Sequence, residues 1–201
     1  MELTQPEVLR LYFCNEPRMQ PNFTMNFELT EEHLMIRDSA RSFAQNELLP
    51  GVIERDNEQK FPTDGVKKMA ELGFLGMMTS PKYLGGGMDT VSYVLAMEEI
   101  SKYDASSAVI MSVNNSLVCW GIEKYGTEDQ KMKYLTRLAS GEVIGAFCLS
   151  EPEAGSDATS QKTTALDMGD HYLLNGTKNW ITNGSSASIY LVIAQTDVSK
   201  G

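Results

Sequence analysis

Hydrophobic residues recur at helical spacing over the first two thirds of the chain. Ile36 and Phe43 belong to an apolar stripe between Thr30, which is suited to cap a helix, and Pro50, which stops the run. The capping box at Thr30 is incomplete, because His33 stands where a Glu or Gln would close it. The same spacing, with capping and stop residues, predicts further helices over 62–73, 91–103, 106–124 and 127–141.

After Gly141 the pattern changes to short runs rich in β-branched and aromatic residues. Met168-Gly169-Asp170 has the composition of a hairpin turn, and Asn175-Gly176 and Asn183-Gly184 are typical turn dipeptides. We therefore predict strands over 143–149, 162–166, 172–174 and 188–194. Helices followed by strands predict an α+β fold, with an all-α domain before a β domain.

Composition and charge narrow the classes of partner. The chain has 201 residues, of which 42% are hydrophobic, so it can bury a sizeable core. Its formal net charge of -10 disfavours nucleic acid and anionic membranes, because a polyanion would be repelled. No apolar run approaches the roughly 20 residues of a membrane-spanning helix, and no signal peptide is recognisable at the start. We expect neither nucleic acid nor membrane as a partner.

The chemistry-bearing residues gather in two segments. The first is Phe147 to Asp157, where Ser150 offers a hydroxyl, Pro152 sets a kink, and the small pair Ala154-Gly155 lets backbone N–H groups converge on a polar ligand. The second is Asn175 to Asn183, which adds the aromatic face of a tryptophan and another hydroxyl. Together the two segments predict a binding site.

Other chemistries are less well supported. Glu151, Glu153 and Asp157 could act as acid/base groups or hard-metal ligands, but three carboxylates in one polar turn usually form a solvated surface. The glycines at 85–87 are better explained by a tight turn than by a phosphate loop. The cysteines are odd in number and widely spaced, which argues against a disulfide framework and a zinc site and favours a reducing compartment. We expect no metal.

The two segments resemble the signature segments of the acyl-CoA dehydrogenase family, and Ser112 to Leu117 is similar to its short-chain, butyryl-type members. The resemblance covers residues 25–201. It implies a helical bundle over 25–142 followed by a β-barrel-like middle domain over 143–201, which would be incomplete. Residues 1–24 would be an N-terminal extension that we expect to be poorly ordered.

The resemblance also implies a cofactor and a reaction. FAD would accept a hydride during α,β-dehydrogenation of a short- to medium-chain acyl-CoA to a trans-2-enoyl-CoA, a step of fatty-acid β-oxidation. The family's glutamate base would lie beyond Gly201, so no catalytic residue is expected in this chain, which should be inactive alone. Ser156 would contact the thioester substrate, and Trp180 would cover the flavin face opposite it. The implied cofactor-binding residues are Phe147, Cys148, Leu149, Ser150, Glu151, Pro152, Glu153, Ala154, Gly155, Ser156, Trp180, Ile181 and Thr182.

The partners follow from the same resemblance. They are the acyl-CoA substrate, an electron-transfer flavoprotein as electron acceptor, and identical subunits forming a tetramer when the protein is full length. The expected location is the cytoplasm, or the mitochondrial matrix in a eukaryote. Two other functions stay open: an acyl-CoA oxidase-like flavoenzyme, and a non-catalytic module that binds acyl-CoA, flavin or another protein. Trp180, taken alone, would more often be a core aromatic than a cofactor lid.

Overall fold

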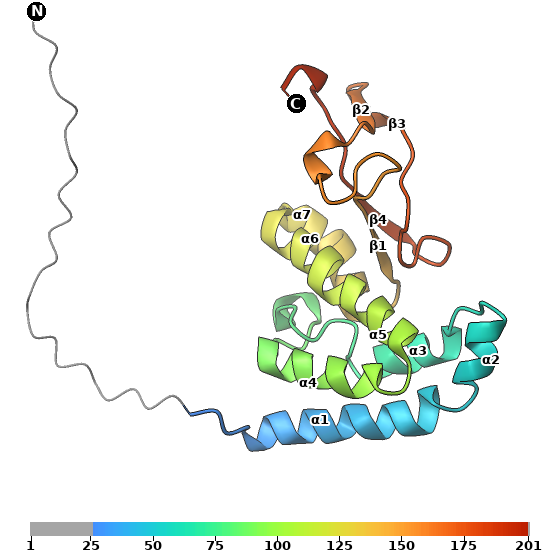
Figure 1. Ribbon diagram of the computed structural model, residues 1–201. Coiled ribbons are helices and arrows are strands. Elements are labelled where there is room, and N and C mark those ends of the chain that lie inside the picture. The colour runs from blue at the N-terminus through green and yellow to red at the C-terminus, as the bar shows by residue number, and fades with distance from the viewer. Residues whose placement is uncertain (1–25, 201) are drawn as a thin grey trace, which may run out of the picture.

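The computed structural model describes residues 26–200, and the extension expected at residues 1–24 lies outside them (Figure 1). The helical region lies at the base of the molecule and the strands lie above it. Its elements are α1 (Glu31–Phe43), α2 (Val52–Asn57), α3 (Thr63–Glu71), α4 (Thr90–Ser101), α5 (Ala105–Ser112), α6 (Trp120–Tyr125), α7 (Glu128–Gln130) and α8 (Thr136–Ala139), followed by β1 (Gly145–Cys148), β2 (Thr164–Asp167), β3 (Tyr172–Asn175) and β4 (Ile189–Val192).

The predicted helices are confirmed, and three of them contain π-helical stretches. Residues 44–48 extend α1, 113–119 join α5 to α6, and 131–135 join α7 to α8. Helix α2 was not predicted, because it is short and none of its residues is buried, so it carries no apolar stripe.

The prediction that the capping box at Thr30 is incomplete was wrong. His33 closes it, because its Nδ1 accepts the Thr30 N–H at 3.2 Å while the Thr30 hydroxyl accepts the His33 N–H at 3.2 Å. A neutral imidazole nitrogen can accept a hydrogen bond as a Glu or Gln oxygen does.

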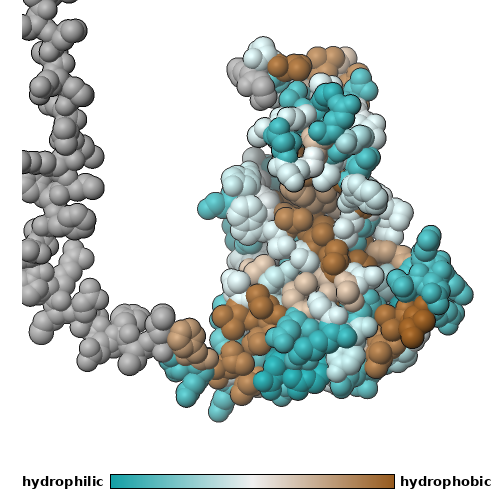
Figure 2. Space-filling view, in the orientation of Figure 1, coloured by the Kyte–Doolittle hydropathy of each residue, from teal (hydrophilic) through white to brown (hydrophobic). Residues whose placement is uncertain are grey.

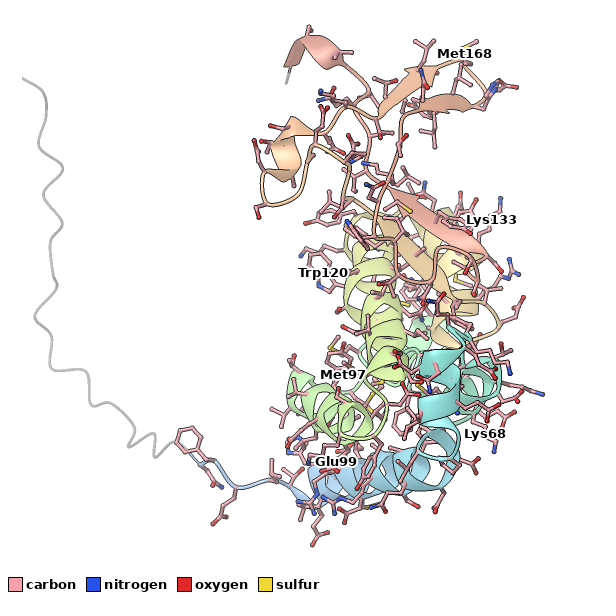
Figure 3. The ribbon with its side chains drawn as sticks, turned by 45° about the vertical axis from the view of Figure 1, so that its right-hand side comes forward. Lys68, Met97, Glu99, Trp120, Lys133 and Met168 are labelled. Carbon is pink, nitrogen blue, oxygen red and sulfur yellow. The ribbon has the colours of Figure 1, made fainter. Side chains whose placement is uncertain are left out.

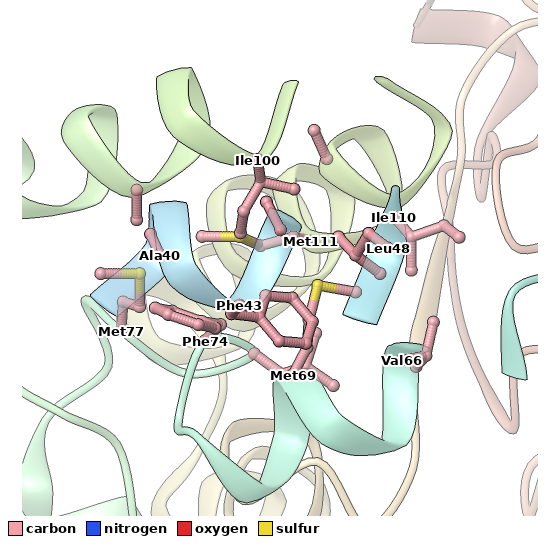
Figure 4. Close-up of a cluster of buried hydrophobic side chains, with 14 of the residues drawn as sticks. Ala40, Phe43, Leu48, Val66, Met69, Phe74, Met77, Ile100, Ile110 and Met111 are labelled. Carbon is pink, nitrogen blue, oxygen red and sulfur yellow. The ribbon is translucent and has the colours of Figure 1, made fainter. Parts of the chain in front are cut away.

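A large apolar core joins the helices of the base. Figure 4 shows Phe43 of α1 beside Phe74, with their ring centroids 5.7 Å apart, and Met69 and Met111 close by. A second cluster lies where the later helices meet the first strand, and Val118, Leu135 and Leu138 are fully buried in it. The helices therefore enclose one large cluster, and they share the second cluster with β1 and β4.

Two buried asparagines connect the long α5–α6 helix to its surroundings. Asn114 donates to the carbonyls of Leu75 (2.8 Å) and Leu138 (3.2 Å) and accepts the N–H of Gly145 in β1 (2.9 Å). Asn115 donates to the carbonyl of Phe74 and accepts the N–H of Met77, both at 2.8 Å. Because buried polar groups are costly unless hydrogen-bonded, these amides set the position of the helix against the loops and the first strand.

The predicted strands are confirmed, and they form two separate pairs. Strands β1 and β4 pair in parallel, with Gly145 opposite Ile189. Strands β2 and β3 form an antiparallel hairpin whose turn includes the bond from the Met168 N–H to the His171 carbonyl. Met168 lies at the end of the molecule opposite α1 (Figure 3). The first pair packs against the helical base and the hairpin projects away from it.

One expectation about apolar length needs correction. The continuous helix over residues 105–125 is long and apolar enough to cross a membrane by length and composition, although no uninterrupted apolar run of that length was found in the sequence. Of its most apolar stretch, 56% is buried inside the protein, and core helices of soluble proteins can have the same length and composition. Length and composition are weak evidence for a membrane span.

Candidate functional site

The two motif segments lie side by side. The first continues from β1, and a tight turn follows in which Glu151 and Ala154 exchange N–H···O bonds of 3.0 and 3.2 Å. The second segment reaches it through the Asn179 N–H, which donates to the Ser150 carbonyl at 2.8 Å. Further along, the Asn183 side chain donates to the Gly145 carbonyl at 2.9 Å. The fold thus brings the second segment against β1 and the turn that follows it, although the bonded residues are far apart in sequence.

Glu151 does not belong to a solvated acidic surface, so that part of the prediction was wrong. Its carboxylate is buried and accepts the N–H groups of Lys162 (2.6 Å) and Thr163 (3.0 Å) and the Lys178 ammonium (2.7 Å). Burial acts to raise the pKa of Glu151, but these hydrogen bonds outweigh it and lower the pKa to about 2. Glu153 and Asp157 are exposed, as predicted.

Several polar groups at the site have no protein partner. Within residues 26–200 no hydrogen bond within the chain engages the hydroxyls of Ser150, Ser156 or Thr182. Asn183 is buried, yet its Oδ1 also lacks a hydrogen-bond partner. The three hydroxyls are available to a ligand that carries complementary polar atoms.

Trp180 is 93% exposed and has a left-handed backbone with φ +58°. A tryptophan in this conformation is strained, and such strain gathers at binding and active sites. Trp180 therefore does not belong to the core that residues 26–200 form. A broad apolar ring held in solvent beside free hydroxyls fits a flat, conjugated ligand with a polar edge.

The remaining predicted site residues divide by burial. Cys148 and Ala154 are buried, and burial raises the pKa of the Cys148 thiol although the charge of Lys178 opposes that rise. The residues that are exposed fully or in part are Phe147, Leu149, Pro152, Glu153, Gly155, Ser156, Ile181 and Thr182. Any contact that Cys148 or Ala154 makes with a ligand must come mainly from the backbone.

A cavity of ≈ 810 Å³ opens between the base and the second segment. Thr182 and Asn183 line one side of it, and Arg55 and Tyr103 line the other. Apolar side chains also gather between the helical base and the strands on the face shown in Figure 2. Among residues 26–200 no group of three or more His, Cys, Asp or Glu side chains is placed to hold a metal ion.

The glycines at 85–87 form a tight turn, as predicted. The Gly87 N–H donates to the Thr79 carbonyl at 2.8 Å, and the Gly86 N–H donates to the Gly76 carbonyl at 2.9 Å. A side chain at Gly85 would collide with the Thr79 backbone, because a Cβ there would lie 2.1 Å from the Thr79 carbonyl oxygen. The backbone N–H groups of Gly86 and Gly87 are thus used inside the loop and do not face a phosphate.

Comparison with known proteins assigns the family. The profile described as "Acyl-CoA dehydrogenase, N-terminal domain" matches residues 30–142, and the corresponding middle-domain profile matches residues 146–201. The chain belongs to the acyl-CoA dehydrogenase family. The family is FAD-dependent, and the fold class predicted from the sequence is confirmed.

The relatives are named as enzymes specific for short acyl chains. The short-chain specific acyl-CoA dehydrogenase of Clostridium acetobutylicum is 46% identical over 88% of this chain and 47% of its own length. The mitochondrial short-chain specific enzyme of Rattus norvegicus is 49% identical over 86% of this chain and 42% of its own length. The chain therefore spans about half the length of the curated relatives it matches.

Solved structures agree with this fold. Butyryl-CoA dehydrogenase from Megasphaera elsdenii has a TM-score of 0.83 at 42% identity, covering 88% of this chain and 47% of that one. A glutaryl-CoA dehydrogenase from Mycobacterium smegmatis in complex with FADH2 has a TM-score of 0.80 at 38% identity, covering 84% and 44%. A chain from a study of the electron transferring flavoprotein of Acidaminococcus fermentans has a TM-score of 0.85 at 47% identity, covering 88% and 47%.

Sequence reasoning missed the side chains that join the two segments. Lys178 lies inside the second motif, where no role is predicted for it; Thr163 falls in the strand predicted over 162–166, and Gln161 lies just before that strand. A lysine in a polar turn is usually solvated, so nothing in the sequence marked this one as buried. Its role becomes visible only from its acceptors in the folded chain.

Proposed function

We propose that this chain forms the N-terminal and middle parts, residues 25–142 and 143–201, of an FAD-dependent acyl-CoA dehydrogenase that converts short- to medium-chain acyl-CoA to trans-2-enoyl-CoA. The observation that carries the proposal is that the two motif segments lie together, joined by the bond from the Asn179 N–H to the Ser150 carbonyl. In this arrangement the Trp180 ring is exposed, and the hydroxyls of Ser150 and Thr182 have no partner within residues 26–200. Bound FAD would supply the hydride acceptor.

The residues of the chain would bind and orient that cofactor. Ser150 and Thr182 would donate hydrogen bonds to its polar edge, where negative charge grows during reduction, and donors already in place lower the cost of that charge. Trp180 would cover one face of the ring, and Ser156 would approach the substrate thioester. The rest of residues 147–156 and Ile181 would shape the surrounding wall, with Cys148, Glu151 and Ala154 contributing through the backbone.

The wider assembly is part of the proposal. The α-proton would be removed by a glutamate outside residues 26–200, so we assign no catalytic base to this part of the protein. An electron-transfer flavoprotein would accept the electrons, and the whole protein would form a homotetramer. We place it in the cytoplasm, or in the mitochondrial matrix of a eukaryote.

Titration with FAD tests the proposal directly. We expect FAD binding by the chain, followed through flavin fluorescence, and binding roughly tenfold weaker or worse for Trp180→Ala, because a stacked aromatic contact is lost. Trp120→Ala is the matched control, since Trp120 is also exposed but lies on α6 (Figure 3). Equal affinities for wild type and Trp180→Ala would remove Trp180 from the site, and no binding by wild type would refute flavin binding by this chain.

A further inference from the structure

Lys178 uses its whole hydrogen-bonding capacity between the two motif segments. Its ammonium donates to the Leu149 carbonyl (2.9 Å), to Glu151 Oε1 (2.7 Å) and to Gln161 Oε1 (3.1 Å). An ammonium has three N–H donors, so each has a partner here. The side chain is 11% exposed, and no donor is left for solvent or a ligand.

Glu151 provides the other half of the contact. Its side chain is 5% exposed and accepts from the backbone of Lys162 and Thr163 as well as from Lys178. Three stretches of chain therefore converge on this carboxylate and ammonium, which we call the Glu151–Lys178 pair: residues 149–151, residues 161–163 and residues 178–179.

The surroundings of the pair explain why it is charged. Burying two ions is costly, and an ion pair repays the cost only when the remaining donors and acceptors are also satisfied. An apolar pair of the same size would leave the Lys162 and Thr163 N–H groups and the Leu149 carbonyl without these partners.

The neighbouring Glu153–Lys162 ion pair provides a contrast. Its side chains are 68% and 74% exposed, and water can replace either partner. Only the buried pair can therefore hold backbone segments in place.

We propose that the Glu151–Lys178 pair is a positioning device that holds the segment of Ser150 and the segment of Trp180 and Thr182 in one register. This inference rests on the proposed flavin site and assigns no contact with the cofactor to the side chain of either residue. The pair acts next to the bond from Asn179 N–H to the Ser150 carbonyl, which directly precedes the strained Trp180. Release of the pair frees the strained residue to relax.

The experiment uses Glu151→Gln and Lys178→Met in a Trp120→Phe background, in which Trp180 is the remaining tryptophan. We expect the N–H groups of Thr163 and Asn179 to exchange with solvent roughly tenfold faster and the Trp180 fluorescence anisotropy to fall. FAD should bind roughly tenfold more weakly, which corresponds to the loss of one well-made contact. Far-UV circular dichroism checks that the helices remain folded.

Control variants distinguish the effect of the position of the Glu151 carboxylate from the effect of its charge. Asp170→Asn removes a carboxylate from the hairpin turn, outside both motif segments, and should change none of the readouts, because that side chain is 89% exposed. Glu151→Asp keeps the charge but is one methylene shorter, so it should show the same exchange defect as Glu151→Gln. The inference would be overturned if both Glu151→Asp and Glu151→Gln behaved like the wild-type protein.

The readouts also separate this inference from the proposed function. Unchanged exchange and anisotropy in both Glu151→Gln and Lys178→Met overturn the inference whether or not flavin binds. Faster exchange with unchanged FAD affinity also overturns it, because the pair would then be structural only. If wild type binds no FAD but the variants exchange faster, the proposed function fails while the register role of the pair stands.

Discussion

The helical region and the β region of this chain bury their apolar residues to different extents. Phe43, Met69 and Met111 are enclosed in the base, whereas the hairpin strand β3 is exposed along its whole length, including Leu173 and Leu174. The base is therefore stabilised mainly by removing apolar surface from water. The site segments depend instead on buried hydrogen bonds such as those of Glu151 and Lys178.

This difference suggests that the two regions have different roles, support for the helical region and ligand binding for the motif segments. A packed helical interior tolerates few rearrangements, so it provides a rigid base for the second segment and β1. The motif segments are loops with few apolar contacts, so their geometry depends on a small number of polar groups. Loss of one such group should disturb the site far more than the stability of the base.

The largest effect is expected from a cavity in the base. Phe43→Ala should lower the free energy of unfolding by about 3–5 kcal/mol, because a buried ring that packs on Phe74 is deleted. Leu173→Ala in the exposed strand should cost about 1 kcal/mol or less. Urea unfolding followed by far-UV circular dichroism measures both. Similar costs for the two variants would contradict the contrast between the regions.

A smaller effect is expected where the two regions are joined. Asn114→Ala removes the bonds to the Leu75 and Leu138 carbonyls and to the Gly145 N–H, and should cost about 2–4 kcal/mol, because those groups stay buried without partners. Faster hydrogen exchange at Gly145 should accompany the loss. Asn46→Ala is the control, since that exposed amide bonds only to Ser42, and a cost as large there would refute the role of burial.

The smallest expected effect is that of acidic pH, which should lower the stability of both the helical region and the β region. The bidentate bond from Arg41 lowers the pKa of Glu99 to about 2 against the opposing effect of burial, and Lys102 adds to the lowering. Figure 3 shows Glu99 on α4 close to α1. A pKa below the ordinary 4.5 means that the ionised carboxylate stabilises the folded state. That stability is present above about pH 4.5 and is lost as the pH falls toward about 2.

Two variants separate the regions in this acid titration. Glu99→Gln should flatten the fall of helical stability between about pH 4.5 and 2, and Glu151→Gln should flatten the change in Trp180 anisotropy over the same interval. Unfolding free energy and anisotropy, each measured against pH, report the two effects. An unaltered slope in Glu99→Gln would show that other carboxylates dominate the acid response of the base.

The features of the fold that could be predicted from the sequence depend on interactions between neighbouring residues. The spacing of Ile36 and Phe43, the helix stop at Pro50 and the hairpin turn after β2 each depend on a few neighbouring residues, so they can be recognised without knowledge of the fold. The motif residues could likewise be found by composition and resemblance. The exposure of Trp180, by contrast, depends on what the rest of the chain leaves uncovered.

The sequence by itself determined the order of the helices and strands other than α2, because periodicity, capping and turn chemistry are local properties. The two motif segments, recognised by their residues, indicated the family. Only the tertiary structure decided that Asn114 joins the base to β1 and that Glu151 is buried against Lys178. Those contacts join residues that are far apart in sequence but close in space. The sequence also does not show whether a polar side chain forms a buried hydrogen bond or is solvated.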